Sequence, residues 1–363
     1  MKRILFISQY LNRFGTEAFM MSVFRGVDKS RFAVDFLLFS KQETDYSREV
    51  EAAGGRVFRV TSRRESMLGW HKQLKAFFKQ HAHEYHAIHF CSNSLTSMAP
   101  IYYAHKYGIP VLVVHAHSSS ARGLHNRVLH RLKRNYVRSI TTHHFACSTE
   151  AGKWFFGNSP SVVIKNGVET PRYRYDEQMR AKVRTTLNIL EDATVLGHVG
   201  RFSVEKNQTF ILDIFATYIN THAGAKLMLV GNGPMLDDMK QKAKALGIQG
   251  DVLFLGERSD VNELMQAMDL FVMPSTFEGL PFVLVEAQCA ALPCVISDVI
   301  SRDICITPNV TYQSLEQSAE VWAKTIEEVL GAYSRQDTSV IIAKAGYSIA
   351  DTIKYLEGVY EGE

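Results

Sequence analysis

The sequence predicts an α/β protein built from two doubly wound parallel sheets in tandem. Its length of 363 residues is typical of two domains rather than one. In both halves, short apolar runs alternate with helical patterns, which is the order expected of parallel βα units. A polar, irregular stretch over residues 167–188 separates the halves. Two such domains would leave a cleft between the carboxyl ends of their sheets, where ligands bind in this architecture.

The expected elements follow from the spacing of the apolar residues. Strands are expected at Arg3–Ser8, Ala33–Leu38, Arg56–Val60, Ala87–Phe90, Val111–His115, His144–Cys147, Val162–Ile164, Thr194–Val199, Lys226–Val230, Val252–Leu255, Leu270–Met273 and Cys294–Ser297. Helices are expected at Glu17–Val27, Leu68–His81, Gln208–His222, Met235–Leu246, Val261–Ala267, Phe282–Ala291, Ser318–Leu330 and Ser348–Tyr360. The domains are therefore expected to cover residues 1–170 and 171–345, with a terminal helical segment over 346–363.

The composition is that of an ordinary water-soluble enzyme. Hydrophobic residues make up 46% of the chain and charged residues 21%, and no run of eighteen apolar residues is present. The opening MKRILFISQY is too short and too soon polar for a signal peptide, and it fits a first strand. Five cysteines without paired metal-ligand spacing indicate buried thiols in a reducing compartment. We therefore expect a cytoplasmic protein.

The charge is unevenly divided along the chain. Residues 1–170 hold 24 Lys and Arg against 11 Asp and Glu, a net charge of +13, whereas the remainder holds 17 against 26, a net charge of −9. This asymmetry predicts that one half meets an anionic surface or substrate.

The most informative stretch runs over Phe271–Pro293, where a buried strand leads through a loop into a helix that opens near Pro281. A glycine beside free N–H groups at a helix start is a ready anion site. Glu278 is expected at the mouth of this helix, and Glu286 about two turns along on the same side. Carboxylates that accept from hydroxyl groups, beside N–H groups that hold phosphate, describe a site for a nucleotide sugar.

A second cluster follows the first strand of the second half. Gly200 and Arg201 end that strand, and Lys206 and Asn207 stand before the next helix. Arg and Lys together suit a diphosphate, because one offers a planar fork and the other a mobile point charge. The alternative is a solvated loop with two surface cations.

With Glu278 and Glu286 set in PSTFEGLPFVLVEAQ, the sequence resembles the retaining glycosyltransferases of the GT-B fold, family 4, of the type that builds capsular and exopolysaccharides. The resemblance implies two Rossmann-like domains, the first binding the acceptor and the second the nucleotide sugar, with a C-terminal helix crossing back to the first. It places Glu278, His117, Arg201 and Lys206 among the catalytic residues.

The resemblance also implies a set of donor-binding residues, which lie in loops after strands. These are Gly15, Gly200, Arg201, Lys206, Asn207, Gly231, Gly233, Arg258, Glu278, Gly279, Leu280, Pro281 and Glu286. The family usually has two glycines where this chain has Phe14 and Gly15, so only Gly15 is carried over. His115 and His117 end a strand with their side chains on one face, but no third ligand stands close in sequence, so no metal is expected there. The other histidines, including His89, are taken as loop and strand-edge residues.

The stretch Arg122–Arg138 predicts a basic amphipathic helix. Such a helix can lie on an anionic membrane, and it can equally pack its apolar stripe into the core and leave a solvated basic face. A nucleic-acid interface ranks last, because no aromatic platform or DNA-binding motif accompanies the charge.

The predicted function is the transfer of a sugar from a nucleoside-diphosphate sugar, with UDP as the expected nucleotide, to a lipid-linked or oligosaccharide acceptor. No Asp-x-Asp motif is present, so protein cations are expected to replace a metal ion, and no cofactor is expected. Two alternatives stay open: a nucleotide-sugar 2-epimerase of the same fold, and a non-catalytic nucleotide-sugar binding protein.

Overall fold

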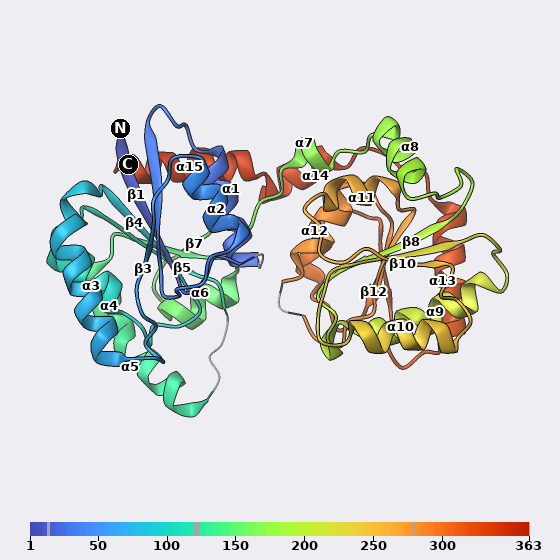
Figure 1. The fold of residues 1–363 in the computed structure, drawn as a ribbon, viewed down its shortest axis with the longest axis horizontal. Coiled ribbons are helices and arrows are strands. Elements are labelled where there is room, and N and C mark those ends of the chain that lie inside the picture. The colour runs from blue at the N-terminus through green and yellow to red at the C-terminus, as the bar shows by residue number, and fades with distance from the viewer. Residues whose placement is uncertain (13–14, 119–122, 279, 363) are drawn as a thin grey trace. The chain divides into compact units, whose positions relative to one another are not determined.

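A computed structural model describes residues 1–12, 15–118, 123–278 and 280–362. The chain divides into two units, the first formed by Met1–Gly167 with Ile349–Glu363 and the second by Val168–Ser348. Each unit is a parallel sheet covered by helices on both faces (Figure 1). Among the described residues, no helix has both the length and the apolar character needed to cross a bilayer.

Unit 1 contains a sheet of seven described strands in the order β3-β2-β1-β4-β5-β6-β7. The strands are β1 (Lys2–Ser8), β2 (Phe32–Leu38), β3 (Val57–Arg59), β4 (Ala87–Ser92), β5 (Val111–Ala116), β6 (His143–Ala146) and β7 (Val162–Val163). The helices are α1 (Gly15–Gly26), α2 (Asp45–Ala52), α3 (Met67–His81), η1 (Ala82–Glu84), α4 (Ala99–Lys106), α5 (Leu124–Ile140), α6 (Thr149–Phe156) and α15 (Ile349–Glu361).

The central strand β1 shows why this sheet is buried on both faces. Its side chains alternate, so Leu5 and Ile7 enter one apolar core while Ile4 and Phe6 enter the other. Helices α3, α4 and α6 cover the first core, and α1 and α2 cover the second together with the C-terminal α15. The return of α15 to unit 1 agrees with the predicted GT-B architecture.

Unit 2 contains a sheet of six described strands in the order β10-β9-β8-β11-β12-β13. The strands are β8 (Val195–Val199), β9 (Lys226–Val230), β10 (Val252–Phe254), β11 (Leu270–Met273), β12 (Cys294–Ser297) and β13 (Val310–Gln313). The helices are α7 (Thr170–Tyr173), α8 (Glu177–Thr186), η2 (Val204–Lys206), α9 (Gln208–Ile219), α10 (Leu236–Ala245), α11 (Val261–Ala267), α12 (Phe282–Cys289), η3 (Arg302–Ile304), α13 (Ala319–Ala332), α14 (Ser339–Ile342) and η4 (Ala343–Tyr347).

Two expectations about unit 2 were wrong. The stretch read as irregular contains α8, which is capped by the Asp176 side chain accepting from the N–H of Met179. The buried residues of this helix are Val183 and Arg184. Because one of them is charged, the sequence lacks the apolar residues at three- and four-residue spacing that normally indicate a helix. Strand β13 was not predicted, because VTYQ is short and only half buried at the edge of the sheet.

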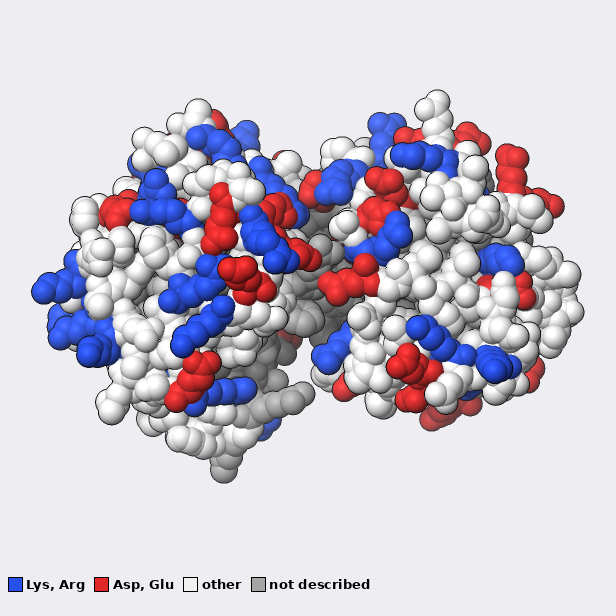
Figure 2. All heavy atoms as spheres, in the orientation of Figure 1, with Lys and Arg blue, Asp and Glu red and all other residues white. Residues whose placement is uncertain are grey.

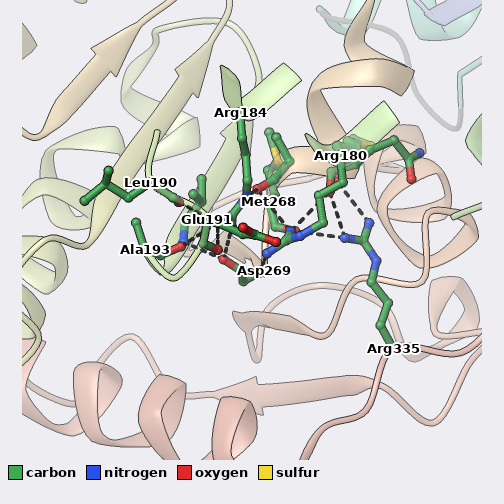
Figure 3. A network of polar contacts seen from close by, with 12 residues as sticks. Arg180, Arg184, Leu190, Glu191, Ala193, Met268, Asp269 and Arg335 are labelled. Atoms are coloured by element: carbon green, nitrogen blue, oxygen red, sulfur yellow. Dashed lines mark hydrogen bonds and ion pairs between the residues drawn. The ribbon is translucent and has the colours of Figure 1, made fainter. Parts of the chain in front are cut away.

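The amino ends of β8 and β11 are joined by a network of arginines around Asp269 (Figure 3). The Asp269 carboxylate accepts from the N–H of Val195 at 2.7 Å and from the guanidinium groups of Arg180 at 2.6 Å and Arg184 at 2.7 Å. Arg335 donates to backbone carbonyls that include those of Met265 and Gln266 in the last turn of α11, and burial lowers its pKa to about 10.

We expect Asp269→Asn to destabilise unit 2 by about 3 kcal/mol, because it leaves the guanidinium of Arg184, only 3% exposed, without its carboxylate. Hydrogen exchange of the β8 and β11 amides measures this loss. The matched control is Asp251→Asn, which removes the more exposed pair with Lys226 and should cost less than about 1 kcal/mol. Equal protection in the two variants would contradict the structural role of Asp269.

Candidate functional site

The predicted donor residues of unit 2 gather at the carboxyl edge of its sheet, around the point where the strand order reverses. From β8 the chain proceeds to β9 on one side, and it returns from β10 to β11 on the other side of β8. The loops after β8 and β11 therefore diverge there, and this is where doubly wound sheets bind ligands. Residues 200–207 belong to the first loop, and Glu278, Leu280 and Pro281 belong to the second.

Glycines bring the loops after β8 and β9 into direct backbone contact. Gly231 has φ +136°, and a Cβ there would lie 2.1 Å from the carbonyl oxygen of Gly200. A Cβ on Gly233 would lie 2.3 Å from the carbonyl oxygen of Phe202, whose N–H donates to the carbonyl of Asn232. Both glycines therefore serve close packing of the loops around the candidate site.

Lys206 and Glu278 form an ion pair across the switch point. The Nζ of Lys206 lies 2.7 Å and 2.9 Å from the two carboxylate oxygens, and the side chains are 21% and 9% exposed. Backbone contacts support this pair, because Thr276 donates its N–H to the carbonyl of Glu205 and Asn207 donates its side-chain amide to the carbonyl of Pro274. The sequence indicated separate ligands for the two charges, and the structure joins them.

The two arginines predicted for the donor differ in their surroundings. Arg201 is exposed, and its guanidinium has no hydrogen bond or ion pair within the described part of the chain. Its backbone is held, because Gln208 donates to its carbonyl at 2.9 Å. Arg258 instead forms a two-point ion pair with Asp260, at 2.8 Å and 2.6 Å. Arg201 is therefore available to an anion, whereas the guanidinium of Arg258 is already engaged.

Glu286 lies in a partly buried position on α12. The helix begins at Phe282 after Pro281, so Glu286 stands little more than one turn along, and not two turns as expected. The hydroxyl of Tyr173 donates to its carboxylate at 2.8 Å. Burial raises the pKa of Glu286 to about 7, and the hydrogen bond from Tyr173 opposes that shift. Leu280 is half buried before the helix, and Gly279 lies outside the described residues.

Gly15 and His117 belong to unit 1. Gly15 is the first residue of α1, and no described atom lies within 4 Å of the position of a Cβ there; Phe14 lies outside the described residues. His117 follows β5 directly, and its ring centroid lies 4.1 Å from that of His115, as expected from the alternation of the strand. Burial lowers the pKa of His117 to about 3, so this imidazole is neutral at physiological pH.

A buried hydrogen-bonded chain lies behind His117. The hydroxyl of Tyr360 on α15 is 2.6 Å from Nδ1 of His89, and Nε2 of His89 is 3.1 Å from Nδ1 of His115. His89 is fully buried in β4, so its assignment as a loop or strand-edge residue was wrong. The pattern AIHF, a polar ring inside an apolar run, is the one sequence signal that could have indicated this. Its partner Tyr360 is 271 positions away.

His89 and His115 could also hold a metal ion together with Cys91. One ligand atom from each residue lies within 4.8 Å of the others. The hydrogen bonds of the two imidazoles already account for their close approach, and burial keeps the pKa of the Cys91 thiol well above its usual range. The arrangement therefore does not by itself require an ion.

Sequence reasoning did not find two further residues of the site. Tyr173, the partner of Glu286, lies 113 positions before it and carries no motif. Gln208 donates both to the carbonyl of Arg201 and toward the imidazole of His198, and so fixes the start of α9 against β8.

Two doubly wound units, with a returning C-terminal helix and a cation-bearing switch point in the second, define the GT-B class of glycosyltransferases. A solved structure of the same fold, Anabaena Alr3699/HepE in complex with UDP, superposes with a TM-score of 0.74 at 21% identity over 100% of both chains. Residues 14–167 match the glycosyl transferase 4-like domain, and residues 179–346 match the glycosyl transferases group 1 family.

The chain is also similar to curated proteins. It is 32% identical to the putative glycosyltransferase EpsF of Bacillus subtilis (strain 168), over 99% of this chain and 96% of that protein. A shorter match, at 29% identity over 40% of this chain and 38% of the relative, is to the UDP-Gal:alpha-D-GlcNAc-diphosphoundecaprenol alpha-1,3-galactosyltransferase of Escherichia coli. The chain belongs to the group 1 glycosyltransferases, with a glycosyl transferase 4-like first unit.

The raised pKa of Glu286 should make the free energy of unfolding depend on pH. Because its pKa is about 7 in the folded chain and about 4.5 when unfolded, the folded state binds the extra proton between these values. Stability from this group is therefore fully present below pH 4.5 and is lost as the pH rises through 7, by up to about 3 kcal/mol.

Glu286→Gln should remove that part of the slope, as measured by chemical unfolding across this pH range. The control is Glu177→Gln, an exposed position at the start of α8, which should leave the slope unchanged. A wild-type slope retained in Glu286→Gln would show that another group titrates.

Proposed function

We propose that this enzyme is a retaining, metal-independent glycosyltransferase that moves a sugar from a UDP-sugar to a lipid-linked or oligosaccharide acceptor in the synthesis of a bacterial surface polysaccharide. The observation that carries the proposal is the carboxyl edge of the unit 2 sheet. There the guanidinium of Arg201, which has no partner among the described residues, the ammonium of Lys206 and the carboxylates of Glu278 and Glu286 belong to two adjoining loops and their helices.

In this proposal the chemistry is electrostatic. Negative charge grows on the departing diphosphate as the glycosidic bond breaks, and Arg201 and Lys206 would stabilise it in place of a metal ion. Lys206 would exchange part of its bond to Glu278 for a phosphate oxygen, which frees the Glu278 carboxylate to accept from a sugar hydroxyl. Glu286 would accept from the ribose hydroxyls. His117, neutral and at the end of β5, would face the transferred sugar during a same-face displacement.

The relatives support the choice of substrates. The E. coli relative is named for UDP-Gal and for alpha-D-GlcNAc-diphosphoundecaprenol, a lipid-linked sugar. Anabaena HepE was solved with UDP, and also with UDP-glucose. A second relative, matched over 44% of this chain, is named as the Vi polysaccharide biosynthesis protein VipC/TviE of Salmonella typhi.

The test is a panel of nucleotide sugars incubated with the full chain, with and without a bacterial membrane extract, in the presence of a chelator. We expect release of UDP from one donor only when extract is present, and proton NMR of the product should show the anomeric configuration of the donor. Arg201→Ala and Lys206→Ala should each lower the rate about 100-fold or more, because each removes a cation that faces the developing charge. The control is Lys240→Ala, an exposed residue of α10, and this variant should keep the wild-type rate.

The same assay separates the alternatives. A 2-epimerase would convert the donor equally with and without acceptor, and a binding protein would turn over nothing. An inverted product, or a rate abolished by the chelator, would contradict the retaining, metal-independent mechanism.

We also propose that α5 contacts an anionic membrane. The predicted helix covers most of α5, whereas Arg122 lies outside the described residues. Val128, Leu132 and Tyr136 form a stripe at i, i+4 spacing that is exposed rather than packed into the core, with Leu132 at 72%. The inner face is held by packing and by hydrogen bonds, since Val137 is fully buried in the core and Nδ1 of His130 accepts from the N–H of Leu95. On the face drawn in Figure 2, blue Lys and Arg side chains and red Asp and Glu side chains are interspersed over both units. Membrane contact would therefore come from the exposed aliphatic stripe of α5 and the basic residues around it.

Val128→Ser with Leu132→Ser should weaken binding to phosphatidylglycerol vesicles about tenfold or more, because two aliphatic side chains can no longer be buried in the bilayer. Co-sedimentation at low and high salt measures the binding. The control is Val340→Ser with Ile341→Ser, two aliphatic residues of unit 2 that are similarly exposed. Unchanged binding in the α5 variant would contradict membrane contact and would indicate that this face of the helix is exposed to solvent.

A further inference from the structure

Two cations of unit 1 converge on a single carbonyl group. Arg63, in the loop that leads from β3 into α3, donates through Nη1 to the carbonyl oxygen of Thr96 at 2.9 Å. Lys133, on α5, donates through Nζ to the same oxygen, also at 2.9 Å. Thr96 lies in the loop that follows β4, so the pair stands beyond the carboxyl edge of the sheet.

The approach of these two cations to one carbonyl oxygen is electrostatically unfavourable when no anion is bound. Two positive charges within reach of one oxygen repel each other, and burial together with Arg63 lowers the pKa of Lys133. Neither side chain has an ion-pair partner within the described residues. The nearby carboxylate of Glu65 accepts from the hydroxyl of Thr61 at 2.8 Å. One bond to Thr96 uses one of five N–H groups of Arg63 and one of three of Lys133.

The loop that holds this pair is rigidly supported. The N–H of Leu95 donates to Nδ1 of His130, so the proton of that neutral imidazole is on Nε2, which donates to the carbonyl of Trp154 at 3.0 Å. The hydroxyl of Ser92 donates to the carbonyl of Ser94, which closes the turn before Thr96. The two cations are thus preorganised rather than collected by chance on a mobile surface.

The stretch of chain that holds Thr96 and Lys133 carries no acidic residue, and exposed aliphatic residues stand near both cations in the sequence. The sequence over residues 85–149 contains no Asp or Glu and seven Lys and Arg. Met67 and Leu68, which open α3 four and five positions after Arg63, are exposed, with Leu68 at 85%. Leu132, the neighbour of Lys133, belongs to the exposed α5 stripe. A cation pair with exposed aliphatic residues close to each cation in the sequence suits an anionic group that carries a hydrocarbon chain.

We propose that Arg63 and Lys133 form a phosphate-binding subsite that holds the diphosphate of a lipid-linked acceptor. This inference rests on the proposed glycosyltransferase function and specifies the class of its acceptor. The guanidinium and the ammonium bind phosphate oxygens with the donors that Thr96 leaves free, and the apolar residues that follow Arg63 and precede Lys133 receive the first part of the lipid chain.

The experiment uses the full chain and the water-soluble probe farnesyl diphosphate, with inorganic pyrophosphate and UDP as separate ligands. Arg63→Gln with Lys133→Gln should weaken farnesyl diphosphate binding about tenfold or more, since it removes two charge-assisted contacts. Wild type should bind farnesyl diphosphate more tightly than pyrophosphate. The matched control is Lys75→Gln with Lys79→Gln, two exposed lysines of α3, which removes the same charge and should change affinity by less than about twofold.

The three ligands and the two double variants distinguish the ways in which the proposed subsite could be wrong. Equal loss in both double variants, or no loss in Arg63→Gln with Lys133→Gln, overturns the subsite. If that variant loses binding to phosphatidylglycerol vesicles but keeps its affinity for farnesyl diphosphate, the pair holds a lipid headgroup and the assignment to the acceptor is wrong. The far-UV circular dichroism spectrum and UDP binding should be equal in all variants, which shows that both units fold. A wild type that binds farnesyl diphosphate but no UDP would refute the proposed function and still support a phosphate site.

Discussion

The candidate site of unit 2 depends on the way β8 and β11 are tied at both ends. At their amino ends, Asp269 accepts from the backbone of Val195 and from two arginines. At their carboxyl ends, the loops are joined by the Lys206–Glu278 ion pair and by the bond from Thr276 to Glu205. Because these adjacent strands flank the topological switch point, fixing both ends fixes the loops that carry Arg201 and lead into α12.

Much of this arrangement could be predicted because its signals are local. The strands around the switch point are short apolar runs, and their bounds agree within about one residue with those observed for β8 and β11. The motif around Glu278 was expected between a strand and a helix, and the structure contains both, as β11 and α12. Where the local signal fails, it fails for a physical reason: α8 buries an arginine in place of an apolar residue, and β13 is a half-buried edge strand.

What the sequence could not supply is the partner of each polar group. Lys206 and Glu278 are 72 positions apart, Glu286 and Tyr173 are 113 apart, and His89 and Tyr360 are 271 apart. Each residue type suggests a ligand when considered alone, yet in the folded chain each has a protein partner. Arg201 is different, since its guanidinium has no partner among the described residues, and it is therefore the cation most directly open to a diphosphate.

The same distinction separates the basic residues of unit 1. Arg134 donates to the carbonyl of Trp154 and fastens α5 to α6, so its charge serves the fold. Lys133 and Arg63 instead share one carbonyl and retain most of their donors. A net positive charge in a sequence therefore says little about binding until the donors are counted. Counted in this way, Arg63 and Lys133 differ from Arg134 in the donors that they retain, and exposed aliphatic residues stand near both of them in the sequence.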